Sequence, residues 1–506
     1  MILSRRLFLV LALPFAFLGP AAAGNPERPN IVVILADDVG YGDLGCYGGR
    51  LVKTPHFDRL AREGRRFTDA HSPASMCTPT RRALLTGTYS WRQSDGATIL
   101  AGNSALCIPP GTTTLASLLK QAGYATGIVG KWHLGLGGKG GSDWNAEIKP
   151  GPLEIGFDYA FMLPATGDRV PCVYVENHRV VGLDPADPIQ VSYREKVGNE
   201  PTGRENPELL KLKHREGRGH DMTIVNGIGR IGWMAGGKSA RWVDEEMADT
   251  FAAKASAFIE QHHAAPFFLY LATHSIHAPQ APHPRFKDTT DCGTRGDALH
   301  ELDDTVGRVL AMLERLGLAE KTLVIFTSDN GGVVEDGYEA IVNPEHQCNG
   351  ILHGAKGTLF EGGHRVPFLA RWPGRIPAGS ENDELIVLVD LCATLAALTG
   401  VPLPADSALD SLNFLPALLG LPHAQPARDT FIVHGAGTNG PFGIRQGAWK
   451  LVQSAGGGIG LGARAERPAR APQLFNLAQD PAEAKNLATK HPEKVQELTQ
   501  LLAKQR

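Results

Sequence analysis

Residues 30–38, with the sequence NIVVILADD, decide the fold. The run NIVVILA is nearly unbroken in its apolar character, which is typical of a strand buried on both faces in a parallel sheet. Two aspartates, Asp37 and Asp38, follow this run directly. The same arrangement, an apolar run that ends in polar residues, recurs at 267–272 (FFLYLA) and at 322–326 (TLVIF).

Amphipathic helix candidates lie between and after these runs, over residues 112–122, 242–262, 298–316 and 384–399. Because strands alternate with helices, the chain is expected to form an α/β sandwich with a large, mainly parallel sheet flanked by helices. The stretch 177–238 lacks a strong period and is predicted to be a long insertion over one rim of this sheet.

The chain is predicted to divide into a leader at 1–23, a large domain at 24–405 and a smaller C-terminal α+β subdomain at 425–506. A Pro-rich connection over 401–428 leads from the large domain to the small one. Within the small subdomain, residues 444–452 are expected to form strands and 493–504 a closing helix.

The first residues are typical of a cleavable secretory leader: Arg5 and Arg6, an apolar stretch from Leu7 to Leu18, and small residues before Gly24. The arginine pair also resembles the twin-arginine export signal, but ordinary leaders carry two arginines as well, so both export routes stay open. The apolar stretch is too short for a membrane span, and no later segment offers one. The mature protein is therefore expected to be soluble and periplasmic or secreted.

Composition places this chain of 506 residues among globular proteins, with 42% hydrophobic and 20% charged residues. The formal net charge is −3 and no long run of Lys or Arg occurs, so no nucleic-acid partner is expected. The seven cysteines are too dispersed for a disulfide scaffold or a zinc cluster, and an odd number leaves at least one unpaired. The ligand must be inferred from local sites.

The three apolar runs are expected to bring their polar ends to one rim, because ligands of open α/β sheets bind beyond the carboxyl ends of the strands. The residues at these ends are Asp37, Asp38, His274, His277, Asp329 and Asn330. A lone Asp-Asp pair after a strand is more often a turn or a helix cap. Together, however, the aspartates and Asn330 supply four oxygen donors, which suit calcium, with magnesium as the alternative, rather than zinc.

Cys77 lies in the block SMCTPTRRALLTG (75–87). A lone cysteine is most often a small buried hydrophobe, but Pro79, Arg81 and the closing Leu-Thr-Gly resemble the signature of the type I sulfatases, which convert this cysteine to formylglycine. Further blocks follow in the family's order: RPNIVVILADDVGYGDLGCYG, GYATGIVGKWHLG, FFLYLATHSIHAPQ, TLVIFTSDNGG and AKGTLFEGGHRVPFLARWPG. The resemblance covers nearly the whole mature chain.

This resemblance implies an alkaline-phosphatase-like fold and the hydrolysis of sulfate esters, with formylglycine 77 as nucleophile and as a further metal ligand. A hydrated aldehyde suits this chemistry because it presents two hydroxyls on one carbon. One attacks the sulfur and expels the alcohol; the other is then deprotonated, and the aldehyde re-forms as sulfate leaves. A helix beginning just after Cys77 would direct backbone N–H groups at the anion. A formylglycine-generating enzyme is the implied partner for maturation.

The resemblance also implies cations around the sulfate, namely Lys131 and His133 in GKWHLG and Lys356 in AKGTLFEGG. A lone lysine is ordinarily solvated, but fixed cations stabilise the spread charge of a sulfate ester more in the transition state than in the ground state. His277 is expected to be the general acid for the leaving alcohol, with Lys356 beside it. His133 is a candidate for the base that collapses the intermediate.

Arg81 is expected to serve twice, in recognition by the modifying enzyme and in support of the aldehyde. His274 either supports a neighbouring residue or is structural. Five residues are candidates for contact with a sugar, although a solvated loop is the plainer account of each: Asp168, Arg169, His214, Arg218 and His220.

The expected substrate is a terminal sulfated sugar, because the insertion at 177–238 would wall the rim and favour a pocket that admits a chain end. The run of blocks is similar to arylsulfatases and N-acetylgalactosamine-6-sulfatases, which favours galactose or N-acetylgalactosamine 6-sulfate. Small aryl sulfates are expected to be cleaved too, since their leaving groups need little protonation.

Two other functions remain alternatives. A phosphonate or phosphate diester hydrolase of the alkaline phosphatase superfamily would use the same sheet, but two zinc ions would require additional histidine and aspartate ligands. A carbohydrate-binding protein that has lost catalysis should have lost Cys77, Lys131, His133 or Lys356, and all four are present.

Overall fold

A ten-stranded sheet forms the centre of the computed structural model, which describes residues 28–333, 337–339, 343–453 and 471–506. Its five middle strands are mutually parallel neighbours, in the order β13 (Thr322–Ser328), β1 (Asn30–Ala36), β12 (Phe267–Ala272), β4 (Ala125–Lys131) and β5 (Tyr159–Leu163). The predicted leader at 1–23 lies outside the described residues.

Shorter strands extend both edges of this parallel core. On the β13 side lie β14 (Phe368–Arg371), which is antiparallel to β13, then β2 (Arg65–Phe67) and β15 (Ser380–Asn382). On the β5 side lie β6 (Val175–Glu176) and β7 (Arg179–Val180), both antiparallel. The predicted mainly parallel sheet is confirmed, and β4 and β5 are strands that the apolar runs had not indicated.

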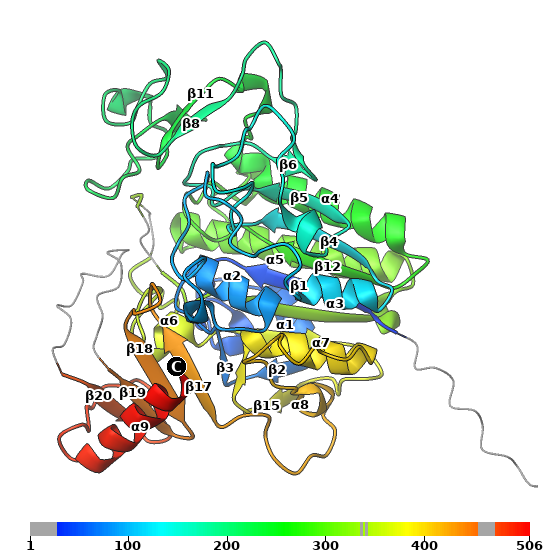
Figure 1. The fold of residues 1–506 in the computed structure, drawn as a ribbon, viewed down its shortest axis with the longest axis vertical. Helices are drawn as coiled ribbons and strands as arrows, with labels where there is room; N and C mark the ends of the chain where they lie inside the picture. The colour runs from blue at the N-terminus through cyan, green and yellow to red at the C-terminus, as the bar shows by residue number, and fades with distance from the viewer. Residues whose placement is uncertain (1–27, 334–336, 340–342, 454–470) are drawn as a thin grey trace, which may run out of the picture.

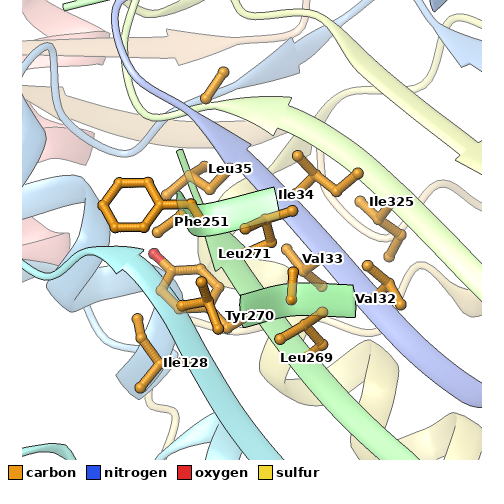
Figure 2. Close-up of a cluster of buried hydrophobic side chains, with 14 of the residues drawn as sticks. Val32, Val33, Ile34, Leu35, Ile128, Phe251, Leu269, Tyr270, Leu271 and Ile325 are labelled. Carbon is orange, nitrogen blue, oxygen red and sulfur yellow. The ribbon is translucent and has the colours of Figure 1, made fainter. Parts of the chain in front are cut away.

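The middle strands are apolar because both faces of the sheet are covered. All seven residues of β1 are buried, and Val33 pairs with Tyr270 on one side and with Ile325 on the other. Figure 2 shows side chains of β1, β12 and their neighbours packed in one cluster, with Phe251 lying over it. Burial on both faces is what the unbroken apolar run NIVVILA requires.

Helices cover the two faces in separate groups (Figure 1). One group contains α1 (Pro55–Glu63), α4 (Met247–His262) and α5 (Gly293–Arg315); α5 contacts both α1 and α4, and α4 lies against β4 and β12. The other contains α2 (Cys77–Thr86), α3 (Leu115–Gln121) and α7 (Leu391–Thr399), which also contact one another, with α3 against β4. This arrangement is the predicted α/β sandwich.

The helix predicted at 384–399 begins later than expected. Residues 384–399 were expected to be helical throughout, but α7 starts at Leu391 after the short strand β16 (Ile386–Val387) and a 3₁₀ turn (Leu388–Asp390). The strand forms because Ile386 pairs with Ala70 of β3 (Ala70–His71), a contact between distant segments that local periodicity does not reveal. The Pro-rich connection at 401–428 likewise contains a short helix, α8 (Leu415–Leu419).

The C-terminal residues form a four-stranded antiparallel sheet, lower left in Figure 1, of β17 (Thr430–His434), β18 (Phe442–Gln446), β19 (Trp449–Val452) and β20 (Gln473–Asn476). The helix α9 (Pro492–Gln505) packs against β18 and β19. The strands expected at 444–452 and the closing helix are thus confirmed. None of the helices among the described residues is long and apolar enough to cross a bilayer.

A buried lysine ties this small sheet to the large domain. Lys450 of β19 donates to Glu361 Oε1 (2.9 Å) and to His364 Nε2 (2.9 Å), both on α6 (Glu361–His364), and lies 2.8 Å from Glu483 Oε1. His71, Glu361 and His364 are close enough together to hold a metal ion. Because the Lys450 ammonium already bonds two of them, a lysine supplies the positive charge of this group.

Residues 177–238 form loops with two short antiparallel pairs, β8 (Gln190–Ser192) with β11 (Trp233–Ala235) and β9 (Ile224–Val225) with β10 (Ile228–Gly229). In Figure 1 β8 and β11 stand above β5 and β6, at the upper end of the molecule. The segment returns to the parallel core where Ile231 N–H donates to the Asp168 carbonyl (2.7 Å), just beyond β5.

A buried carboxyl on α5 makes the stability of this fold pH-dependent. Glu301 is 7% exposed and accepts a hydrogen bond from the His283 N–H (2.9 Å). Burial raises the pKa of Glu301 to about 7, from 4.5. Between these values the folded state holds a proton that the unfolded chain releases, so this residue's contribution to stability falls as pH rises from about 4.5 to 7.

Glu301→Gln should therefore gain stability over the wild type as pH rises from 5 to 8, by a few kcal/mol and at most about 3. Thermal unfolding of both proteins across this range measures the difference. Glu320→Gln, at an exposed carboxyl, is the matched control, and its difference in stability from the wild type should not change with pH. A flat difference for Glu301→Gln as well would show that its carboxyl is ionised in the folded protein.

Candidate active site

The carboxyl ends of the five parallel strands meet at one rim, and each end carries polar residues. Across the sheet from β13 to β5 these are Asp329 and Asn330, Asp37 and Asp38, His274 and His277, Lys131 and His133, and Asp168 and Arg169. The rim is where an open α/β sheet binds its ligand. The structure thus brings together three strand ends that the sequence indicated and two, those of β4 and β5, that it did not.

Four side chains form the deepest part of the rim. Ligand atoms of Asp37, Asp38, Cys77 and Asp329 all lie within 4.8 Å of one another, and all four residues are buried. Asn330 donates from Nδ2 to Asp38 Oδ1 (2.8 Å), whereas its buried Oδ1 has no hydrogen-bond partner among the residues that the structure describes. An orphaned amide oxygen beside three carboxylates is the donor set of a hard divalent cation, so these residues fit such an ion.

Three cations already bind the three carboxylates. Lys131 Nζ lies 2.6 Å from Asp37 Oδ2, and Lys356 Nζ lies 2.9 Å from Asp38 Oδ2.

Arg81 contacts Asp329 Oδ2 from Nε (2.9 Å) and from Nη2 (2.7 Å). Because all three cations are buried, their charges balance those of the carboxylates where water cannot. A divalent cation would turn this balanced cluster positive, which favours an anionic ligand.

The two outer carboxylates differ in their affinity for a proton. Burial by itself raises the pKa of Asp38, but Lys356, His277 and Lys131 outweigh it, so this pKa lies below its usual range. At Asp329 burial prevails over the opposing effect of Arg81, and the charge on Asp37 adds to it, so the pKa is raised. Of these two carboxylates, Asp38 is therefore the one held more firmly in its charged form.

Cys77 is the first residue of α2, and Met76 before it is extended. Its Sγ donates to Asp37 Oδ1 (3.7 Å), and burial raises the pKa of the thiol. A protonated thiol is a weak nucleophile, so the encoded cysteine is poorly suited to attack by itself. The expected helix start at Cys77 is confirmed, and Arg81 lies one turn along the same face, toward Asp329.

The three histidines of the rim contact different partners. His277 Nε2 is 3.8 Å from Asp38 Oδ2, and its Nδ1–H donates to the Ala278 carbonyl (2.5 Å). His274 Nδ1 is 3.8 Å from Asp37 Oδ2, and its ring centre lies 5.6 Å from that of His277. His133 donates from Nε2 to the Leu100 carbonyl (3.0 Å). Burial, with Lys131 and Arg169 nearby, holds the pKa of His133 well below its usual value, so His133 is neutral.

Two residues of the rim, Asp38 and His133, have strained backbones. Asp38 has φ 64° and His133 has φ 55°, in the left-handed region that residues other than glycine rarely adopt. Such strain persists where surrounding contacts enforce it, and it gathers at functional sites. The Asn330 turn is equally constrained, because a Cβ on Gly331 would lie 1.9 Å from the Gly362 carbonyl oxygen.

The candidates for substrate contact fall into two groups. Asp168, Arg169 and His220 form one cluster: Arg169 Nη1 and His220 Nε2 lie 2.9 Å and 3.1 Å from Asp168 Oδ2. Burial raises the pKa of Asp168, but Arg169, His220 and His277 lower it well below its usual range, so the cluster is within electrostatic reach of His277.

His214 and Arg218 belong elsewhere, to a separate hollow on the insertion. The sequence had set all five residues together as one group. They separate because His220 turns inward toward Asp168, whereas the preceding loop faces outward, and only the folded loop shows this.

One residue that supports the backbone at Asp38 was not predicted from the sequence. Arg295 of α5 is fully buried and donates to Asp43 Oδ2 (2.6 Å) and to the Asp38 carbonyl (3.1 Å). His346 lies 2.7 Å from the other oxygen of Asp43. No local motif marks Arg295. Arg295 also precedes the helix predicted at 298–316, because α5 begins earlier, at Gly293.

Comparison with known proteins agrees with this geometry. The sulfatase family profile matches residues 29–401, and that of the N-sulphoglucosamine sulphohydrolase C-terminal region matches 353–506. An N-acetylgalactosamine-6-O-sulfatase of Bacteroides thetaiotaomicron is 49% identical over 94% of this chain and 93% of its own. Human arylsulfatase A is 35% identical over 98% of this chain and 90% of its own.

A solved sulfatase structure from a glycosaminoglycan-metabolising locus of Bacteroides thetaiotaomicron superposes with a TM-score of 0.90 at 48% identity, covering 94% of this chain and 99% of its own. The chain belongs to the sulfatase family and is a sulfuric ester hydrolase, as its type I signature predicted. The family implies a divalent metal and a formylglycine at position 77.

The diester-hydrolase alternative shares only the fold. A phosphonate monoester hydrolase of Agrobacterium radiobacter superposes with a TM-score of 0.57 at 19% identity, over 94% of this chain and 95% of its own. This likeness supports the alkaline-phosphatase-like architecture. The activity is inferred from the sulfatase relatives instead.

Asp329→Ala should lower both the bound metal and the activity, because it removes one of three carboxylates from the donor set. Asp390→Ala is the matched control, since Asp390 is also a buried partner of an arginine, Arg428, away from the rim. Each change breaks a buried ion pair and is expected to cost about 3–5 kcal/mol of stability. Elemental analysis should show metal loss in Asp329→Ala alone; equal metal content in both variants would exclude Asp329 as a ligand.

Proposed function

We propose that the protein removes sulfate from the terminal sugar of sulfated carbohydrates, with galactose or N-acetylgalactosamine 6-sulfate as the substrate. The observation that carries this proposal is the convergence of three buried cations and three carboxylates around Cys77 at the start of α2. The Bacteroides relative named for N-acetylgalactosamine 6-O-sulfate, 49% identical to this chain, supports the choice of sugar.

Calcium is the proposed ion, with magnesium as the alternative, because the ligands are hard oxygens from Asp37, Asp38, Asp329 and Asn330. When bound, the ion supplies Lewis-acid polarisation of a sulfate oxygen. Stoichiometric calcium in the purified protein supports this proposal, and stoichiometric zinc would overturn it.

Formylglycine at position 77, made by a formylglycine-generating enzyme, supplies a hydroxyl nucleophile and an internal route for releasing sulfate. The surrounding residues fit this group: position 77 is buried, lies 3.7 Å from Asp37 Oδ1, and begins a helix whose free N–H groups favour an anion. Arg81 holds Asp329 against this position and also serves as a recognition residue for the modifying enzyme.

The remaining rim residues have different roles in the reaction, according to their positions. Lys131 and Lys356, each held by a carboxylate, place positive charge where a sulfate ester spreads its negative charge. His277 gives a proton to the leaving alcohol, because it lies beside the Asp38–Lys356 pair. His133 is neutral and so can accept a proton as the base at its buried Nδ1, which has no partner among the described residues.

Asp168, Arg169 and His220 contact the hydroxyls of the terminal sugar, because their cluster follows β5 at the rim, within electrostatic reach of His277. Small aryl sulfates enter the same site and depend less on protonation. We further propose that residues 1–23 are a secretory leader and that the enzyme acts in the periplasm or outside the cell, as a catalytic domain over 24–405 with a subdomain over 425–506.

The nucleophile is tested by Cys77→Ala, since a methyl group can be neither oxidised nor attack sulfur. We expect activity on 6-sulfated sugars to fall at least about 10³-fold with the melting temperature nearly unchanged. Cys392→Ala removes an equally buried thiol from α7 and should keep its activity. Substantial sulfate release by Cys77→Ala would sink the mechanism.

The general acid is tested by His277→Ala with two kinds of substrate. A sugar alkoxide needs a proton to leave, so turnover of a sugar 6-sulfate should fall about 10²–10⁴-fold, whereas that of an activated aryl sulfate should fall less than about tenfold. His274→Ala, whose ring neighbours His277, is expected to affect both substrates by the same factor. Equal losses on both substrates in His277→Ala would remove this residue from the acid role.

A further inference from the structure

A second hollow lies on the insertion, outside the catalytic rim. Its volume is about 820 Å³, and four basic side chains line it: Lys213, His214, Arg215 and Arg218. Glu216 and Glu339 also reach its wall. We call this feature the basic hollow. At this size it can hold a sugar unit, and none of the catalytic residues forms part of its wall.

Acidic side chains neutralise several cations elsewhere in the insertion. Arg204 pairs with Asp221, Lys196 with Glu205, and Lys211 with Glu245.

In contrast, the side chains of Lys213 and Arg218 make no hydrogen bond or ion pair with any described residue. His214 adds a buried Nδ1 that likewise has no hydrogen-bond partner. Polar groups left unsatisfied on a concave surface gain by binding a ligand of opposite charge.

Two residues, Tyr338 and His220, connect the basic hollow to the proposed sugar contacts. The backbones of His214 and Tyr338 form an antiparallel β-bridge, and the Glu339 N–H donates to the Lys213 carbonyl (2.9 Å). The Tyr338 ring packs edge-on against His220, with ring centres 4.7 Å apart, and His220 in turn bonds Asp168. His220 and Tyr338, which are both buried, thus lie between Asp168 and the basic hollow, and a substrate that contacts both places must be longer than one sugar.

We propose that the basic hollow binds an anionic group, a carboxylate or a second sulfate, on the sugar adjoining the terminal sulfated residue. This inference rests on the proposed function and adds a preference for acidic oligosaccharides over isolated sugars. Lys213 and Arg218 would pair with the anion, while Glu216 and Glu339 can accept hydrogen bonds from hydroxyls of the same sugar.

Four substrates separate the sources of charge. They are the N-acetylgalactosamine 6-sulfate monosaccharide, its disaccharide with a uronic acid, the same disaccharide with the carboxyl reduced to an alcohol, and that neutral disaccharide carrying a second sulfate. We expect the wild type to show a lower KM for one or both acidic disaccharides than for the neutral one, by about tenfold, with the difference shrinking at high salt. Which acidic disaccharide gains identifies the anion.

Lys213→Ala/Arg218→Ala should raise KM for the acidic disaccharide about tenfold, and it should leave kcat and the kinetics of the monosaccharide unchanged. Arg194→Ala/Lys196→Ala removes the same charge from exposed positions of the same insertion and serves as control. Melting temperatures verify that both variants are folded.

Equal KM values for acidic and neutral disaccharides in the wild type, or equal effects of the two double variants, would overturn this inference while leaving the proposed function intact. Failure of the wild type to hydrolyse any of the four substrates, and galactose 6-sulfate as well, would contradict the proposed function itself, and this inference with it.

Discussion

Charge balance at the meeting point of β1 and β13 is the constraint on which the rest of the site depends. Three carboxylates lie together where water is excluded, which would be prohibitive unless each were paired. Lys131, Arg81 and Lys356 come from a strand, a helix and a loop, and each binds a different aspartate. The same contacts therefore hold the cations where an anionic ester must bind, so stability and recognition use one set of interactions.

The C-terminal sheet belongs to this framework. The Gly357 N–H, next to Lys356, donates to the Ser75 carbonyl (2.8 Å), and the Ser75 N–H donates to the His434 carbonyl of β17 (3.3 Å). Lys450 binds α6 shortly after Lys356. The backbone before Cys77 and the loop that carries Lys356 are thus braced together against the small sheet.

Much of the fold followed from the sequence because its strongest signals are local. NIVVILA, FFLYLA and TLVIF each became a strand over the expected residues, and their polar ends met at the rim. β4 was not predicted because Gly127 and Gly130 interrupt its apolar run. Here Gly130 is needed: a Cβ there would lie 1.9 Å from the Ala272 carbonyl of β12. The late start of α7 depends on the pairing of β16 with β3, which only the tertiary structure supplies.

The candidate site shows the same division. Oxygen ligands after strands, and a cysteine in a spaced block, can be recognised along the chain. The support of Asp38 by Arg295, and the separation of His220 from His214, depend on contacts between distant segments. A loop of irregular backbone gives no period from which the direction of a side chain could be inferred, so the grouping of the sugar-contact candidates needed the structure.

The central claim, that residue 77 acts in sulfate release only after its conversion to formylglycine, is tested most directly by one correlation. Preparations made with graded amounts of formylglycine-generating enzyme would be assayed for the converted fraction of the Cys77 peptide by mass spectrometry, and for the rate of sulfate release. The account predicts a rate proportional to the converted fraction, extrapolating to zero for the unmodified thiol. A rate independent of conversion, or appreciable release by protein that carries only the thiol, would contradict it.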